Sequence, residues 1–214
     1  MAMRRLLIAT ANRAKLAEYR LILRGIDLEL VSLAELGISE SPEETGATFT
    51  ENALIKARFY FQRARIATLA DDGGLEIDAL GGEPGVRSHR WLGSGGDDSD
   101  QALINEVIRR MKGVEAGRRA ARIRATIALI YEEGGAIREK TAEGAIEGAI
   151  AERAYREIRA GFPYRAVLVI PGRNCYLGEL GDEQEAQISQ RRIAVSKLRD
   201  ELERIAAGRG AQLS

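Results

Sequence analysis

The sequence predicts an α/β fold built on a mixed β-sheet, and three observations indicate it. A short, continuously apolar run at residues 6–10 is typical of a buried strand, and residues 28–33 and 66–70 indicate a second and a third strand. Segments with apolar residues at helical spacing alternate with these runs, a pattern that favours parallel strands joined by crossover helices. An alternating segment from residue 123, followed by Glu-Glu-Gly-Gly, predicts a hairpin and therefore adds antiparallel strands.

The elements of the first half follow from local signals. A helix begins near Ala14, directly after the first strand. A polar loop follows the second strand, and Thr48 with Glu51 fits a capping box that opens a second helix. We expect the third strand to stop abruptly, with residues 71–74 (Asp-Asp-Gly-Gly) forming a loop.

The second half contains the strongest helical pattern of the chain, which ends at Lys112-Gly113. Its apolar positions keep the three- and four-residue spacing: Leu103, Ile104, Val107, Ile108 and Met111. Residues 167–170 indicate another buried strand, and one last helix is expected from about residue 189 to residue 207. We expect residues 1–207 to form a single domain of two lobes and residues 208–214 to be a flexible tail.

Composition excludes several classes of protein. Of the 214 residues, 45% are hydrophobic and 30% are charged, which is ordinary for a globular chain and not for a disordered one. No apolar run approaches the roughly 20 residues that cross a bilayer, so we expect no membrane association. The 32 basic and 32 acidic residues cancel, which argues against a nucleic-acid partner. The single cysteine cannot form an internal disulfide, and we therefore expect a cytoplasmic protein.

The turn Thr10-Ala11-Asn12-Arg13-Ala14-Lys15 joins a buried strand to the start of a helix. Free backbone N–H groups and the positive end of the helix dipole make such a place suitable for phosphate. Asn12 can donate a hydrogen bond there, and Lys15 can place a charge on a phosphate oxygen. The alternative is a capped turn with a solvated lysine.

Two further motifs carry carboxylates and amides. In residues 44–57, the capping box explains Thr48 and Glu51 but gives no reason for Asn52 and Lys56. These two residues are four apart and share a helix face. Asp71 and Asp72 are adjacent, and because like charges repel, a purely structural role would make the pair costly. Paired carboxylates suit Mg²⁺, which binds one or two of them together with substrate phosphates. A surface Asp-Gly turn remains the alternative.

These three motifs, in this order, resemble the inosine/xanthosine triphosphate pyrophosphatase family. Members open with Thr-Gly-Asn-x-x-Lys, which is residues 10–15 here with Ala11 in place of the glycine. They continue with Glu-Thr-Gly-x-Thr-Phe-x-Glu-Asn-Ala, matched by residues 44–53. Ala-Asp-Asp-Ser-Gly-Leu corresponds to residues 70–75, with Gly73 in place of the serine that helps to bind substrate. The match is close over residues 6–93 and looser to about residue 200.

The resemblance implies an elongated mixed sheet with flanking helices, two lobes around a central cleft, and a homodimer. It implies a Mg²⁺-dependent hydrolysis of nucleoside triphosphate substrates such as ITP, dITP and XTP to the monophosphate and pyrophosphate. Glu44 and Asp72 would hold the metal, with Asp72 as general base and Asp71 and Lys56 beside it as catalytic residues. Thr10, Asn12, Lys15 and Gly73 would bind the substrate.

The base-reading half of the chain diverges from the family. The family's Phe-Gly-Tyr-Asp-Pro is Phe162-Pro163-Tyr164-Arg165-Ala166 here, and its Ser-His-Arg is Ser189-Gln190-Arg191. By resemblance Phe162, Tyr164, Arg165, Gln190 and Arg191 bind the substrate, with Phe162 stacking on the base. A family lysine falls on Glu185, or near Gln184 if a residue is inserted. Arg165 is expected either to donate to a 6-keto oxygen or to form an ion pair with Glu185.

The changed residues of the base-binding half are compatible with three functional hypotheses. The favoured one is an active pyrophosphatase with altered or relaxed base preference. The others are a family member with a changed substrate and a catalytically weak nucleotide-binding protein. The complete set of carboxylates and lysines favours the first, because a protein that only binds has less need of paired carboxylates.

Overall fold

The computed structural model describes residues 4–93 and 97–208. The chain forms two compact units. The first comprises Met1–Asp72, Ala125–Gly144 and Arg191–Ser214, and the second comprises Gly73–Arg124 and Ala145–Gln190. The expected tail is outside the described residues except for Gly208. The expectation of a single domain over residues 1–207 stays a prediction.

A seven-stranded mixed sheet, with strand order β2-β1-β3-β4-β5-β6-β7, confirms the predicted fold class. The strands are β1 (Arg4–Ile8), β2 (Leu28–Ser32), β3 (Ala67–Ile77), β4 (Ala120–Glu133), β5 (Ala136–Ile150), β6 (Leu168–Ile170) and β7 (Cys175–Tyr176). β1 pairs in parallel with both β2 and β3, whereas β6 pairs antiparallel with β5 and β7. The turn between β4 and β5 lies at Gly134 and Gly135, as the sequence predicts.

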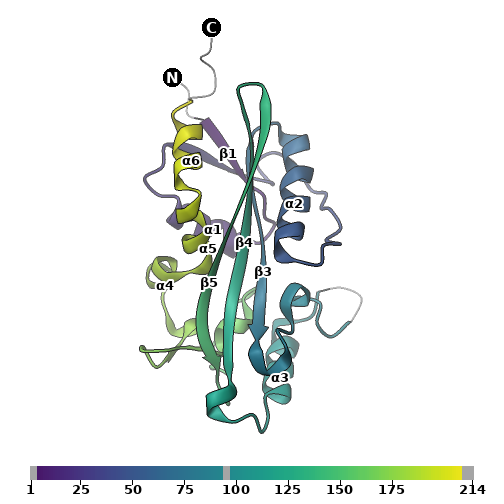
Figure 1. Ribbon diagram of the computed structural model, residues 1–214, viewed down its shortest axis with the longest axis vertical. Helices are drawn as coiled ribbons and strands as arrows, with labels where there is room; N and C mark the ends of the chain where they lie inside the picture. Colours follow the sequence, from purple (N-terminus) through teal and green to yellow (C-terminus); the bar gives the residue numbers. More distant parts are fainter. Residues whose placement is uncertain (1–3, 94–96, 209–214) are drawn as a thin grey trace. The chain divides into compact units, whose positions relative to one another are not determined.

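Helices cover both faces of the sheet in the first unit (Figure 1). They are α1 (Arg13–Ile22), α2 (Phe49–Ala64), α5 (Gln190–Lys197) and α6 (Arg199–Ala206). On one face, α1, α5 and α6 pack on a buried cluster that includes Leu69, and on the other face α2 packs on a cluster that includes Ala70. These two neighbouring residues of β3 point in opposite directions, as successive strand residues do.

Both helices that carry the predicted motifs begin with side-chain caps. The Asn12 side chain accepts hydrogen bonds from the backbone N–H groups of Ala14 and Lys15 at the start of α1. The predicted capping box of Thr48 and Glu51 is present at the start of α2. Such caps satisfy N–H groups that have no partner within the helix, and they fix where each helix begins.

The second unit has one apolar core, to which α3 (Asp100–Arg110) contributes the predicted Leu103, Ile104 and Val107, all fully or almost fully buried. Its other α-helix is α4 (Asp182–Ile188), a short polar segment that the sequence did not indicate. Short 3₁₀ helices in this unit span Asp78–Leu80, Gly85–Arg87, Ala116–Arg118, Pro163–Ala166 and Leu177–Glu179.

Two expectations about elements were wrong. Residues 71–74 are not a loop, because β3 continues through them to Ile77. Gly74 is needed there because the chain comes close to Ser88. A Cβ on Gly74 would lie 1.9 Å from the Ser88 Oγ, which accepts a hydrogen bond from the Leu75 N–H. The last helix is also divided, because Leu198, with a ψ of 9°, separates α5 from α6.

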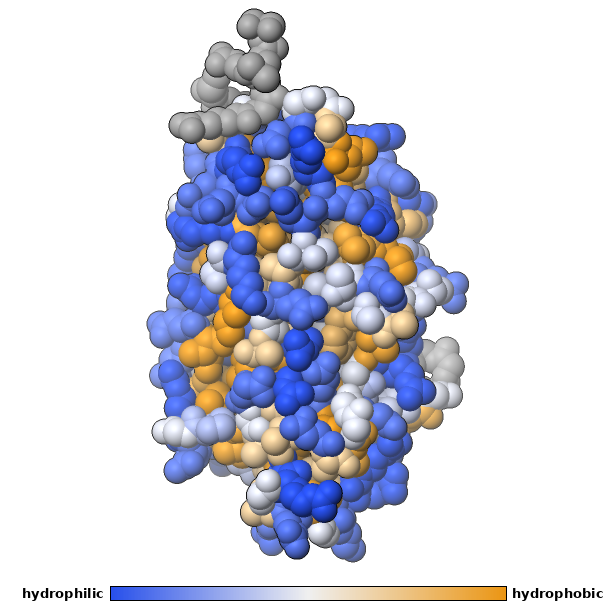
Figure 2. Space-filling view, viewed as in Figure 1, coloured by the Kyte–Doolittle hydropathy of each residue, from blue (hydrophilic) through white to orange (hydrophobic). Residues whose placement is uncertain are grey.

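The surface in view is mainly polar and charged, with apolar side chains in scattered groups (Figure 2). The large apolar side chains that are exposed come from separate parts of the chain: Leu92, Ile137, Ile158 and Ile193. Among the described residues, no helix is both long enough and apolar enough to cross a membrane.

Candidate functional site

Asp71 and Asp72 lie within β3 and not in a turn, so their side chains point to opposite faces of the sheet. Asp71 shares its face with Leu69 and with α1 and α5, whereas Asp72 shares its face with Ala70 and with α2. The two carboxylates therefore have different sets of partners. This arrangement removes the like-charge cost that we expected for adjacent aspartates.

The partners of Asp71 are two cations. Its Oδ2 accepts from Lys15 Nζ at 3.1 Å and from Arg191 Nε at 3.0 Å, and Arg191 Nη1 also pairs with Glu18 Oε2 at 3.0 Å. All four side chains are largely or fully buried. Burial by itself would raise the pKa of the Asp71 carboxyl, but Lys15 and Arg191 outweigh burial and hold that pKa well below its usual range.

Lys15 and Arg191 thus meet at Asp71 although they lie far apart in the chain. Burial lowers the pKa of Lys15, and the attraction to Asp71 opposes this shift. Burial likewise acts to lower the pKa of Arg191, but Asp71 and Glu18 raise it, so the guanidinium stays charged. Sequence reasoning missed Glu18, whose only local signal is its position three residues after Lys15 on α1.

The partners of Asp72 come from α2. Lys56 Nζ lies 3.1 Å from Asp72 Oδ1 and 3.2 Å from Glu44 Oε1, so one ammonium joins both carboxylates. Asn52 Nδ2 donates to the other oxygen, Asp72 Oδ2, at 3.1 Å. Burial acts to lower the pKa of Lys56, but attraction to Asp72 and Glu44 outweighs burial and raises it. The predicted shared face of Asn52 and Lys56 is confirmed.

The residues of this group fit a divalent cation. A lysine ammonium already lies between the oxygens of Glu44 and Asp72, which shows that these oxygens converge on one positive charge. Glu44 and Asp72 supply two carboxylates, and within the described part of the chain no third His, Cys, Asp or Glu side chain joins them as a ligand. Two carboxylates are a donor set that fits Mg²⁺, which binds one or two of them and takes its remaining ligands from water and phosphates.

Thr10 and Asn12 form a capped turn before α1. The Asn12 backbone N–H donates to Thr10 Oγ1 at 3.2 Å, while the Asn12 Oδ1 caps the helix. The alternative interpretation, a capped turn, is thus confirmed for Asn12. The solvated lysine that this interpretation expected is wrong, because the Lys15 side chain is largely buried against Asp71.

In the second unit, Arg165 connects an aromatic ring with a carboxylate. Its guanidinium carbon lies 3.7 Å from the centre of the Phe162 ring, and the guanidinium forms a buried ion pair with Glu185. Arg159 adds a second contact to Glu185 at 3.6 Å. Of the two roles expected for Arg165, the ion pair with Glu185 is present in the structure. The Phe162 ring itself is only partly buried.

The other expected residues of this unit differ in their surroundings. Tyr164 is part of the apolar core, and its hydroxyl donates to the backbone oxygen of Ser88. Burial raises the pKa of Tyr164. Gln190 is 5% exposed, and among the described residues no hydrogen bond reaches its Oε1. Gly73 is partly buried within β3. Substrate contacts by these residues stay a prediction.

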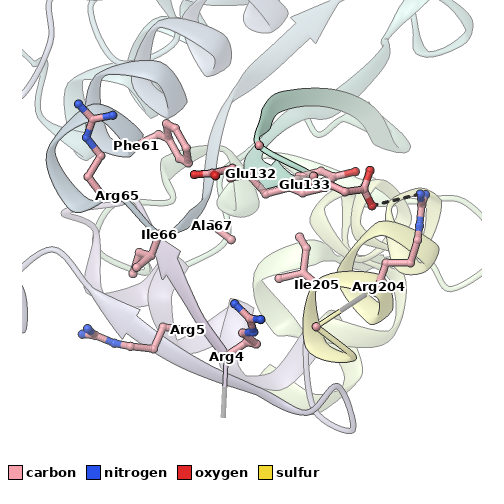
Figure 3. A pocket seen from close by; sticks show the side chains of 14 residues that line it. Arg4, Arg5, Phe61, Arg65, Ile66, Ala67, Glu132, Glu133, Arg204 and Ile205 are labelled. Atoms are coloured by element: carbon pink, nitrogen blue, oxygen red, sulfur yellow. Dashed lines mark ion pairs between the residues drawn. The ribbon is translucent and has the colours of Figure 1, made fainter. Parts of the chain in front are cut away.

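A cavity of about 360 Å³ lies elsewhere in the first unit, at the amino ends of the parallel strands β1 and β3 (Figure 3). Ala67 lines it, and Asp71 is four residues further along the strand, roughly 13 Å away. Arg65, which caps the end of α2, and Arg204, 3.9 Å from Glu133, also line it. Arginines at the C-terminal ends of helices are stabilised by the helix dipole, so Arg65 and Arg204 have a structural explanation.

Comparisons with known proteins agree along nearly the whole chain. The sequence profile of the Ham1 family matches residues 6–201. The chain is 39% identical over 207 residues to a dITP/XTP pyrophosphatase of Methylococcus capsulatus, covering 96% of this chain and 99% of the relative. It is 40% identical over 203 residues to a dITP/XTP pyrophosphatase of Bacillus subtilis, covering 94% of this chain and 98% of the relative.

Solved structures give the same result. The structure of a HAM1 protein from Coxiella burnetii matches with a TM-score of 0.80 and 32% identity, and it covers 94% of this chain and 98% of that chain. The Staphylococcus aureus Ham1 protein matches with a TM-score of 0.79 at the same identity and coverage. The protein therefore belongs to the Ham1 family, which confirms the resemblance drawn from its motifs.

Proposed function

We propose that this protein hydrolyses ITP, dITP and XTP to the monophosphate and pyrophosphate, with Mg²⁺ as cofactor. The observation that carries the proposal is the convergence of Glu44 and Asp72 on a single cation position at Lys56. The names of the relatives, which are dITP/XTP pyrophosphatases, support the same reaction.

In this proposal, residues of the first unit bind the metal, accept a proton and stabilise charge. Glu44 and Asp72 hold the metal, and bound Mg²⁺ supplies charge neutralisation on the phosphates. Asp72 accepts the proton of the water that attacks the α-phosphorus, while the bond to the oxygen that bridges to the β-phosphorus breaks. Lys15 and Lys56 stabilise the negative charge that develops on the phosphate oxygens. Asp71 keeps Lys15 and Arg191 in place, since its Oδ2 contacts both.

The base is assigned to side chains of the second unit. The partly exposed Phe162 ring offers a stacking surface, and Arg165 on that ring fixes its position. The amide of Gln190 can accept from the N1–H of a 6-keto purine and donate to O6, and its Oε1 accepts no hydrogen bond from the described residues. A homodimer and a cytoplasmic location remain predictions.

The test is pyrophosphate release with Mg²⁺ from ITP, XTP, dITP, dUTP and the four common nucleoside triphosphates. We expect release from ITP, dITP and XTP. The same assay on Asp72→Asn should show a loss of roughly 10²–10⁴-fold, the usual contribution of a general base. Asp78→Asn is the matched control, because Asp78 is half exposed and, like its ion-pair partner Arg122, belongs to the second unit.

Three outcomes of this assay decide between the functional hypotheses. Full activity of a folded Asp72→Asn variant would contradict the role of Asp72. Release from a different nucleotide would relocate the substrate. Nucleotide binding without any release would favour the weak binding protein.

A further inference from the structure

Asn52 has no assigned role in the proposed reaction, although it lies at the centre of the candidate site. It is 1% exposed and sits in the second turn of α2, one helical turn before Lys56. Asparagine is a weak helix former, and a buried amide needs partners for both its oxygen and its nitrogen. A purely structural helix position of this kind is better filled by alanine, as in the neighbouring Ala53.

Both ends of the Asn52 amide are engaged, and its orientation is fixed. The backbone N–H of Gly46 can only donate, and it lies 2.7 Å from Asn52 Oδ1. The amide nitrogen therefore faces Asp72, where Nδ2 donates to Oδ2 at 3.1 Å. A flipped amide would place a donor against the Gly46 N–H and an oxygen against the Asp72 carboxylate. Only one of the two orientations satisfies both neighbours.

Gly46 is required for this arrangement. A Cβ at residue 46 would lie 2.6 Å from Asn52 Oδ1 and 2.9 Å from the Asn52 backbone nitrogen. The close approach lets the amide reach the chain two residues beyond Glu44. Asn52 and Lys56 thus make the same double connection: each joins the segment of Glu44–Gly46 to Asp72.

The two oxygens of Asp72 are divided between these partners. Oδ2 accepts one hydrogen bond from the Asn52 amide and keeps a second lone pair, whereas Oδ1 faces the ammonium of Lys56 together with Glu44 Oε1. A carboxylate held by one oxygen cannot rotate freely, so the other oxygen stays directed at the cation position. Partners that hold a metal ligand in this way typically change metal affinity or activity by about 10–100-fold when they are removed.

We propose that Asn52 is a positioning residue that orients Asp72, so that Oδ1 and Glu44 bind the divalent cation together. This inference rests on the proposed function, in which Asp72 holds the metal. It concerns the metal-binding geometry itself, which makes it measurable without turnover.

The experiment compares Asn52→Leu and Asn52→Asp with the unchanged protein. Leucine has a similar size and removes both hydrogen bonds, whereas aspartate keeps an acceptor for Gly46 and loses the donor to Asp72. Mn²⁺ binding is titrated by electron paramagnetic resonance in the absence of nucleotide, and kcat and KM are measured at saturating Mg²⁺. Glu44→Gln serves as the positive control for loss of metal binding. Asn105→Asp, the same change on α3, is the matched negative control.

For Asn52→Leu we expect Mn²⁺ affinity to fall at least tenfold and kcat to fall about 10–100-fold, with KM changed less than threefold. For Asn52→Asp we expect the same loss of kcat, since the second carboxylate repels Asp72. Values within threefold of the unchanged protein for both variants, while Asp72→Asn is inactive, would overturn the inference. If no nucleotide is hydrolysed, the proposed function fails, and the Mn²⁺ titration of Asn52→Leu still decides the role of Asn52.

Discussion

Replacing Glu185 by glutamine removes the charge that balances a buried guanidinium. Glu185 is 3% exposed and contacts Arg165, which is itself 5% exposed and stacks on Phe162. In the variant, Arg165 keeps its aromatic neighbour but loses its carboxylate. Arg159, at 3.6 Å from Glu185, loses the same partner, but it is more exposed, so water can replace that contact.

The expected loss of stability follows from the burial of the pair. Removing one partner of a buried ion pair costs about 3–5 kcal/mol because the other charge is left in a low-dielectric environment. The glutamine oxygen still accepts a hydrogen bond, so we expect the free energy of unfolding to fall by about 2–3 kcal/mol only. With a urea dependence of about 2 kcal/mol per molar, the midpoint of unfolding should fall by about 1–1.5 M.

Urea unfolding at pH 7, followed by circular dichroism, measures this loss. The double variant Arg165→Met/Glu185→Met removes both charges and should lie within about 1 kcal/mol of the unchanged protein. Glu157→Gln is the control, because the side chains of Arg156 and Glu157 are 83% and 70% exposed, and its midpoint should not move measurably. A midpoint shift below 0.3 M for Glu185→Gln, or an equal loss in the double variant, would refute the reasoning.

Two further predictions concern base choice and pH. Restoring the family's residues by Gln190→His, Arg165→Asp and Glu185→Lys together should change the ratio of kcat/KM for ITP over ATP by about tenfold, and an unchanged ratio would count against these residues as base readers. Two arginine neighbours hold the pKa of Glu106 at about 2, below its ordinary 4.5, so its contribution to stability is present above pH 4.5 and is lost as the pH falls toward 2. Glu106→Gln should therefore lower stability by about 1 kcal/mol at pH 7, and thermal unfolding should show this difference shrinking at pH 3.

Local patterns predicted the parts of the fold that depend on nearby residues. The capping box at Thr48 and Glu51 is such a case, and so is the shared helix face of Asn52 and Lys56, because both follow from spacing along one helix. The Arg165–Glu185 ion pair was one of two roles expected for Arg165, since the charges at both positions are reversed relative to the family pattern.

Features that depend on distant contacts could not be predicted in this way. Two glycines after two aspartates are typical of a turn, and only the approach of Ser88 to Gly74 shows why the strand continues. Glu18 gains its role through Arg191, which is 173 positions away in the chain. The opposite directions of Asp71 and Asp72 could not be predicted either, because we expected both residues in a loop. Residues in a loop need not alternate between two faces, whereas residues in a strand do.

Because the two aspartates face opposite sides of one strand, the register of β3 decides which of them meets which set of cations. A shift of this strand by a single residue would turn every side chain to the other face. Asp71 would then face α2, and Asp72 would face Lys15 and Arg191, so neither set would meet the carboxylate that it surrounds in the structure. Insertions and deletions of one residue between Ala67 and Asp72 are therefore excluded in an active protein, whereas the hairpin turn at Gly134 and Gly135, which lies outside both sets, can change length.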